Sequence, residues 1–285
     1  MKDDDRIRRL LLDTLAVNAL GQLLEVGRAS GVTLVPVKGV VLSRWFYDSP
    51  DERPYRDLDL LVSRAALAPF AAAVRERGWP IRVVSLEMGE LEFEMGQLVV
   101  EVHAEFGRRD LTSLTTSDVI ARARSDRETF PFEVLRIDDV DHLLLLVANV
   151  TKKGYTYANP HQPVDLERML VHLEPRWDAV IARAHDASSS TALYSVATWM
   201  VQERGSKEFG RFLRAWSPHS RRLLPVVVRL QRRLETRRGN RLESPFGILG
   251  LALATLTPDD WHLRGRGLAR VVRRGIYRRL GRDPD

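Results

Sequence analysis

The segment from Arg56 to Val62 most constrains how this chain can fold, because charged and apolar residues alternate at its start. Successive side chains of a β-strand point to opposite faces, so Asp57 and Asp59 share one face while Leu58 and Leu60 share the other. Two carboxylates on one face repel each other unless a cation lies between them. The segment therefore predicts a strand with one face in a core and the other beside a bound cation.

A second alternating segment lies downstream, at residues 98–103. Val100 and Val102 form its apolar face, and Glu101 and His103 share the opposite one. If the two strands are neighbours, Glu101 joins the two aspartates, and three carboxylates surround one site. Carboxylates together with substrate phosphates are typical ligands of a hard divalent cation, so the pattern predicts Mg²⁺ (or Mn²⁺).

Other glutamates compete with Glu101 for the position of third ligand. Glu105 follows on the same segment, and Glu92 and Glu94 come shortly before it. For Glu92 and Glu94 we favour an exposed edge strand whose charges discourage aggregation. His103 either orients a carboxylate, contacts a substrate or is an ordinary hydrogen-bonded histidine.

The third signal is Lys38-Gly39, which follows a short apolar run ending at Val37. Lysine occurs only at positions 2, 38, 152, 153 and 207, so a lysine close to the carboxylate segment stands out. A glycine before a helix makes a natural anion site, and the lysine adds charge. The pair predicts a phosphate-binding turn, and an ordinary strand-to-helix turn is the alternative.

In this order, Lys38-Gly39, Arg56-Asp57-Leu58-Asp59 and Glu101-Val102-His103 resemble the uncharacterised nucleotidyltransferase family of the polymerase-β-like superfamily. The resemblance covers residues 30 to 110 well and continues more weakly to about residue 205. The wider superfamily usually carries Gly-Ser or Gly-Gly where this chain has Lys38-Gly39.

The resemblance implies transfer of a nucleoside monophosphate from an NTP to an acceptor that is unknown, either a small molecule or a peptide, as in natural-product tailoring or antibiotic modification. Asp57, Asp59 and Glu101 would be the catalytic metal ligands. Residues at the nucleotide would be Lys38, Gly39, Arg56, His103, Lys152, Lys153 and Asp165, the last three from a second domain that closes one wall of the cleft. For any single residue of that second domain, a solvated surface role is the alternative that we favour. For Arg56, at the start of its strand and on the opposite face, a structural salt bridge is the alternative.

The hydrophobic periodicity predicts an α+β protein. A helix over 4–29 and strands over 33–37, 56–62, 80–85, 91–94 and 97–106, with helices over 40–46 and 64–77, give a small mixed sheet with helices. Helices over 117–124, 138–150, 164–172, 177–185 and 191–205 follow. We predict a nucleotidyltransferase core with its N-terminal helix at 1–115 and a helical domain with a basic C-terminal helix at 116–285.

Composition excludes several classes of protein. The 285 residues include no cysteine, which rules out disulfides and thiolate metal sites. The N-terminal residues are too charged for a signal peptide, and the longest apolar runs are too short to span a bilayer. We therefore expect a cytoplasmic protein without a membrane span, while its oligomeric state stays open.

The formal net charge is +6, and arginine supplies nearly all of the positive charge. We interpret this arginine content as a compositional bias rather than as a nucleic-acid surface. Residues 263–282 alternate arginine with apolar residues, which leaves an RNA-directed or toxin-like nucleotidyltransferase as one alternative. An inactive module that only binds nucleotide is the other.

Overall fold

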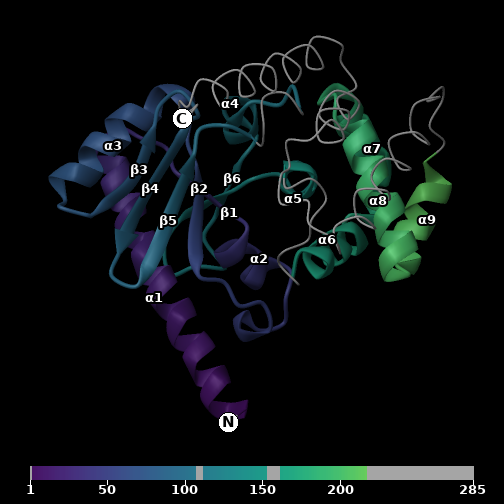
Figure 1. The fold of residues 1–285 in the computed structure, drawn as a ribbon, viewed down its shortest axis with the longest axis horizontal. Helices are drawn as coiled ribbons and strands as arrows, with labels where there is room; N and C mark the ends of the chain where they lie inside the picture. Colours follow the sequence, from purple (N-terminus) through teal and green to yellow (C-terminus); the bar gives the residue numbers. More distant parts are fainter. Residues whose placement is uncertain (1, 107–111, 153–160, 217–285) are drawn as a thin grey trace, which may run out of the picture. The chain divides into compact units, whose positions relative to one another are not determined.

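The computed structural model describes residues 2–106, 112–152 and 161–216, which fold into two compact units (Figure 1). Of these residues, 2–106 and 114–142 form the first unit, and 112–113, 143–152 and 161–216 belong to the second. The predicted domain boundary after residue 115 stays a prediction. The compact units differ from it because residues 116–142 pack with the first unit. The basic segment at 263–282 lies outside the described residues.

A five-stranded mixed sheet organises the first unit, as the sequence predicts. Its spatial order is β1-β2-β5-β4-β3. β2 and β5 are parallel, while the other neighbours pair antiparallel. The strands are β1 (Val35–Val37), β2 (Asp57–Leu61), β3 (Ile81–Ser85), β4 (Glu90–Met95) and β5 (Leu98–His103).

The core lies on the apolar face of this sheet, against α1 (Lys2–Ala29) and α3 (Leu67–Glu76) (Figure 1). Phe93 of β4 is fully buried there, with its ring edge-on to Phe70 of α3 and stacked on Trp79. Leu20 and Leu23 of α1 belong to the same cluster. Truncating a buried aromatic ring in such a core costs about 3–5 kcal/mol, so these contacts hold the sheet on its helices.

Short elements complete the first unit around the sheet. The hairpin of β6 and β7 was not predicted, because its strands are three residues long and show no clear alternation. β7 contacts β1, beside the Lys38-Gly39 turn. These elements are α2 (Gly39–Trp45), η1 (Pro50–Glu52), η2 (Arg64–Ala66), α4 (Thr116–Ala121), β6 (Arg124–Asp126) and β7 (Val134–Arg136).

The prediction of an edge strand at Glu92 and Glu94 is wrong. β4 lies inside the sheet, between β5 and β3. The two glutamates instead form ion pairs with Arg82 on β3, which is the edge strand. Their charges are therefore partly balanced across the strand pair.

The second unit is helical, as the sequence predicts. α5 (Asp139–Lys152) begins in the first unit, and Asp138 caps its start by accepting the Val140 N–H at 3.0 Å. α9 was not predicted, although Phe209, Phe212 and Trp216 recur at helical spacing and are buried. The remaining helices are α6 (His161–His172), η3 (Glu174–Arg176), α7 (Trp177–Asp186), α8 (Ser190–Arg204) and α9 (Lys207–Ala215).

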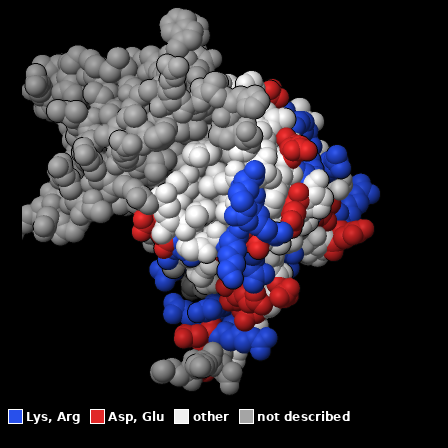
Figure 2. All heavy atoms as spheres, turned by 90° about the vertical axis from the view of Figure 1, so that its right-hand side faces the viewer, with Lys and Arg blue, Asp and Glu red and all other residues white. Residues whose placement is uncertain are grey.

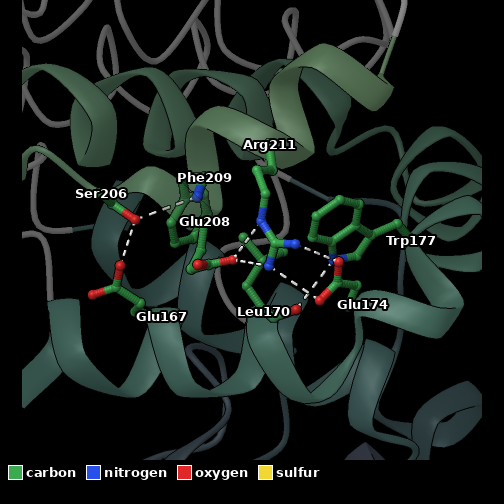
Figure 3. A network of polar contacts seen from close by, with 8 residues as sticks. All are labelled: Glu167, Leu170, Glu174, Trp177, Ser206, Glu208, Phe209 and Arg211. Carbon is green, nitrogen blue, oxygen red and sulfur yellow. Dashed lines mark hydrogen bonds and ion pairs between the residues drawn. The ribbon is translucent and has the colours of Figure 1, made fainter.

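A polar network ties α9 to the preceding helices (Figure 3). Arg211 of α9 pairs with Glu174 of η3 at 2.7 Å and with Glu208 of its own helix. Ser206 caps α9 by accepting the Phe209 N–H at 3.3 Å, and its hydroxyl donates to Glu167 of α6 at 2.5 Å. The network has the character of a structural tie, because every charge in it meets a partner within the same unit.

α1 is long and apolar enough to cross a membrane by length and composition, over Asp4–Ala29. Half of an apolar 18-residue window within this helix is buried inside the fold. Leu20, Leu23 and Val26 of this helix pack in the core of the sheet unit, which accounts for its apolar character.

Candidate active site

The parallel pairing of β2 with β5 brings the predicted carboxylates together. In its register, Asp59 lies opposite Glu101 and Leu61 opposite His103. Asp57 lies one pleat earlier than Asp59 and on the same face. One ligand atom each from Asp59, Glu101 and His103 lies within 4.8 Å of the others. The face opposite the core therefore carries a compact group of metal-ligating side chains.

Lys38 reaches into this group. Its Nζ forms an ion pair with Oδ1 of Asp59, and the two side chains are only 18% and 4% exposed. Burial acts to lower the pKa of Lys38, but the charges of Asp59, Glu101 and Asp57 outweigh it and raise the pKa above its usual value. The lysine is therefore a half-buried cation among carboxylates.

The backbone at Lys38 bends sharply between β1, which ends at Val37, and α2, which begins at Gly39. Lys38 has φ 56° and ψ −123°, a region that favours glycine. Such backbone strain costs about 1–3 kcal/mol and recurs at functional sites. Sharp strand-to-helix turns also present the catalytic side chain in some hydrolases. We call residues 37–39 the lysine elbow.

Gly39 is required in the elbow by a close approach of Tyr55. A Cβ atom at position 39 would lie 2.8 Å from the Tyr55 Cβ, which no side chain tolerates without movement. Tyr55 is held in turn by its hydroxyl, which donates to Asp13 of α1 at 2.8 Å. Asp13 also pairs with Arg44 of α2. These contacts connect the elbow to α1, so the core helix helps to define the turn.

His103 joins the two carboxylates across the strands. Its Nε2 lies 3.1 Å from Asp59 Oδ1 and 3.4 Å from Glu101 Oε2. Burial acts to lower the pKa of His103, but its hydrogen bonds to Asp59 and Glu101 raise it above the usual value. His103 thus contacts both carboxylates and has cationic character, while its role at the site stays a prediction.

The carboxylates themselves differ in charge. Burial, followed by the charges of Asp59 and Glu101, raises the pKa of Asp57. Burial acts to raise the pKa of Asp59 too, but Lys38 and His103 outweigh it and lower that pKa strongly. The hydrogen bond from His103 lowers the pKa of Glu101. Asp59 and Glu101 are therefore firmly ionised, and Asp57 carries the charge that is least compensated.

The donor set suits a hard divalent cation. Asp57, Asp59 and Glu101 offer carboxylate oxygens on one face, as Mg²⁺ and Mn²⁺ prefer, and His103 adds a ring nitrogen that Mn²⁺ accepts. Lys38 and His103 already provide positive charge to the same oxygens. The group is thus arranged to hold a cation. Within the described part of the chain, Asp57 forms no ion pair with Lys38 or His103, which leaves its charge available to a metal.

The other residues predicted at the nucleotide are Arg56, Lys152, Lys153 and Asp165. Arg56 precedes β2 and is exposed. Asp165 is buried in α6 of the second unit. Lys152 ends α5, but its side chain and the whole of Lys153 lie outside the described residues. Their predicted roles stay predictions.

One residue of this region was missed. His142, on the first turn of α5, accepts a hydrogen bond at its Nε2 from the Lys38 backbone N–H at 3.2 Å, across 104 positions of sequence. A signal was present in the sequence, because His142 is the single polar side chain in an otherwise apolar run from residue 142 to 148. Its partner could not be read from that pattern.

Comparisons with known proteins bear on these residues. A family model described as an uncharacterised nucleotidyltransferase matches residues 10–204, well over half of the chain. A search of curated proteins gives no match.

Solved structures with a similar fold are distant in sequence. The antibiotic-resistance factor ANT(2'')-Ia is 13% identical over 61% of this chain and 98% of its own, with a TM-score of 0.44. An apo tRNA-processing enzyme is 14% identical over 88% and 77%, with a TM-score of 0.28. A tRNA nucleotidyltransferase complexed with a primer tRNA and an incoming ATP analog is 13% identical over 91% and 99%, with a TM-score of 0.27.

Identities and TM-scores this low establish no shared activity, so the assignment rests on the family match. That match spans the lysine elbow, the strand of Asp57 and Asp59 and the strand of Glu101. The chain belongs to the uncharacterised nucleotidyltransferase family and is an enzyme of the nucleotidyltransferase class.

Proposed function

We propose that this enzyme uses Mg²⁺ or Mn²⁺ to transfer a nucleoside monophosphate from an NTP to a hydroxyl or phosphate oxygen of a small molecule or peptide. The observation that carries the proposal is the register of β2 with β5. It sets Asp59 opposite Glu101, with their ligand atoms within 4.8 Å, on the face that also holds Asp57. A structural role alone would not need three carboxylates on one face.

The proposed reaction forms a bond between the acceptor oxygen and the α-phosphorus, and it breaks the bond from that phosphorus to the pyrophosphate group. The acceptor proton passes to the carboxylate group and then to solvent. A bound divalent cation would neutralise charge on the triphosphate. Asp57 and Asp59 would hold the cation, Glu101 would orient the acceptor oxygen, and Lys38 would exchange its contact with Asp59 for a phosphate oxygen.

His103 supports this arrangement from the side. Its ring nitrogen contacts both Asp59 and Glu101, so it holds the two carboxylates in a fixed relation before substrates bind. Positioning of this kind contributes much of the rate in phosphoryl transfer, because the protein has little covalent chemistry to perform.

We favour a small acceptor over a nucleic acid. On the face shown in Figure 2, the described lysine and arginine side chains lie among aspartates and glutamates and do not form a separate basic surface. Ion pairs within the described residues also join Arg211 to Glu174 and Arg127 to Glu133. Nucleic-acid binding relies on basic groups that are available to phosphates.

The test uses NTPs labelled on the α-phosphate, incubated with the purified full chain, Mg²⁺ or Mn²⁺, and a fractionated cell extract. We expect label to move to an acceptor with release of pyrophosphate, and Asp59→Asn to abolish the transfer. Glu94→Gln is the matched control, because it removes a carboxylate from the same sheet that pairs with Arg82 instead. Equal transfer by Asp59→Asn and wild type would refute the proposal.

A further inference from the structure

The conformation of the lysine elbow is unfavourable for the residue that adopts it. Lys38 adopts a positive φ, and glycine would do so more easily. Among the described residues, the only other non-glycine residue with positive φ is Ser188. A lysine keeps such a conformation only where surrounding contacts hold it.

The contact that holds the Lys38 backbone comes from His142. The Lys38 N–H donates to His142 Nε2 at 3.2 Å. Because Nε2 accepts, the proton of the neutral imidazole lies on Nδ1. His142 therefore binds the elbow in one tautomer only.

The surroundings of His142 maintain that neutral form. The residue is fully buried, and its ring meets Trp45 and Phe46 edge-on, with centroids 6.4 Å away in each case. Arg136 lies over both of these rings and pairs with Asp139. His142 thus contacts the residue before α2 and the residues at its end.

Burial lowers the pKa of His142 to about 3; the charge of Asp139 opposes this shift, and the charges of Arg136, Arg53 and Lys38 add to it. A protonated ring could not accept the Lys38 N–H, so the pocket preserves the acceptor at neutral pH.

The other ring nitrogen indicates a role beyond packing. Nδ1 of His142 is buried and has no hydrogen-bond partner among the described residues. An apolar side chain would fill the same space without this unpaired N–H group, which is costly to bury. What the histidine offers that an apolar residue cannot is the acceptor at Nε2.

We infer that His142 is a positioning residue of the active site: by accepting the Lys38 N–H it holds the lysine elbow in its positive-φ conformation and so directs the Lys38 ammonium to Asp59. This deepens the proposed function, since the group it positions lies among the proposed metal and nucleotide ligands. It concerns the conformation of Lys38, however, and can be tested without catalysis.

The test compares His142→Met with His142→Gln. Methionine fills similar space but offers the N–H only a weak sulfur acceptor. The glutamine Oε1 lies the same number of bonds from Cβ as the histidine Nε2. The readout is the rate of reductive methylation of each lysine with formaldehyde, measured by peptide mass spectrometry. Exposed Lys207 on α9 is the internal control.

In the wild type we expect Lys38 to react slowly, because its amine is buried and paired with Asp59. His142→Met should raise the rate at Lys38 by about tenfold, which corresponds to the upper part of the range for one hydrogen bond. His142→Gln should restore slow reaction, and Lys207 should react equally in all variants. Mg-NTP affinity, measured by calorimetry, should fall with His142→Met alone.

Phe46→Leu separates positioning from packing. It removes an aromatic contact of His142 but leaves the hydrogen bond, so the melting temperature should fall while Lys38 stays protected. If His142→Met does not fold, Lys38→Gly and Lys38→Ala are compared instead in wild-type and His142→Gln backgrounds. The glycine variant should then unfold at a higher urea concentration in both, because both hold the positive φ.

Wild-type protection of Lys38 in His142→Met would overturn the inference, as would failure of His142→Gln to restore it or equal urea midpoints for the two Lys38 variants. If no NTP binds even the wild type, the proposed function fails, while the methylation rates still decide the role of His142.

Discussion

Two regions meet at Lys38, and each contains a histidine, half-buried His103 in one and buried His142 in the other, with opposite electrostatic character. On the carboxylate face, Asp59 and Glu101 raise the pKa of His103. In the aromatic pocket formed by Trp45, Phe46 and His142, burial lowers the pKa of His142 to about 3. His103 contacts Asp59, which pairs with the Lys38 side chain, and His142 contacts the Lys38 backbone.

The difference teaches that burial alone does not set the charge of a histidine. Both rings are removed from water, which disfavours the charged form. Two carboxylates stabilise the charged form of His103. His142 instead contacts the rings of Trp45 and Phe46, and the positive charges of Arg136, Arg53 and Lys38 further disfavour its charged form. The first region is suited to binding charged groups, and the second to holding a backbone in place.

The largest effect should come from the two aspartates of the carboxylate face. Asp57→Asn and Asp59→Asn should each lower nucleotidyl transfer by orders of magnitude, because each removes a metal ligand. Their effects on stability should differ in sign. The raised pKa of Asp57 means that folding disfavours its charge, so Asp57→Asn should raise the metal-free melting temperature at neutral pH.

The lowered pKa of Asp59 means the reverse, so Asp59→Asn should lower that temperature. Thermal unfolding in chelator, beside the label-transfer assay, measures both quantities. Equal shifts for the two variants would contradict the asymmetry of charge in this region.

Glu101→Gln should separate binding from chemistry. Mg-NTP affinity should stay within a few-fold of wild type, because the two aspartates hold the metal of the triphosphate. Transfer should fall by orders of magnitude, because the acceptor oxygen is no longer oriented. Calorimetry and single-turnover label transfer give the two values. If affinity and rate change together, Glu101 belongs to the nucleotide side of the site.

Lys38→Ala should weaken Mg-NTP binding by about 1–3 kcal/mol, the range for hydrogen bonds to charged groups. The variant keeps the backbone N–H that donates to His142. It therefore removes only the contacts of the Lys38 side chain and leaves those of His142 with Trp45 and Phe46 in place. If the variant binds Mg-NTP with wild-type affinity in a calorimetric titration, Lys38 does not contact the nucleotide and only balances the charge of Asp59.

The last comparison is a pair of opposite pH dependences. Unfolded histidine titrates near 6.5, and folded His142 near 3, so between these values the unfolded state binds the extra proton. His142 should therefore reduce stability as pH falls through this window, by about 1.4 kcal/mol per pH unit at most. His142→Gln should flatten this part of the urea-stability profile.

His103 should act in the opposite sense. Its folded pKa is raised, so its contribution is present below pH 6.5 and lost as pH rises through the folded pKa. His103→Gln should therefore lose most stability at acidic pH. If the stability of the two variants depends on pH in the same way, the two regions do not differ in charge as described.

The sequence by itself determined the sheet strands and the residues of the carboxylate face. Asp57, Asp59, Glu101 and His103 could be placed because strand periodicity is local and separates charged from apolar side chains. The main helices followed from the same kind of local pattern. Short elements without such a period, β6 and β7, could not be found in this way.

Only the tertiary structure decided how distant residues meet. Parallel pairing chose Asp59 as the neighbour of Glu101, and the position of β4 inside the sheet turned Glu92 and Glu94 toward Arg82. The contact between His142 and Lys38 joins positions 104 residues apart. Such contacts depend on the packing of whole elements against one another, and no local period in the chain encodes which buried acceptor will meet which strained backbone.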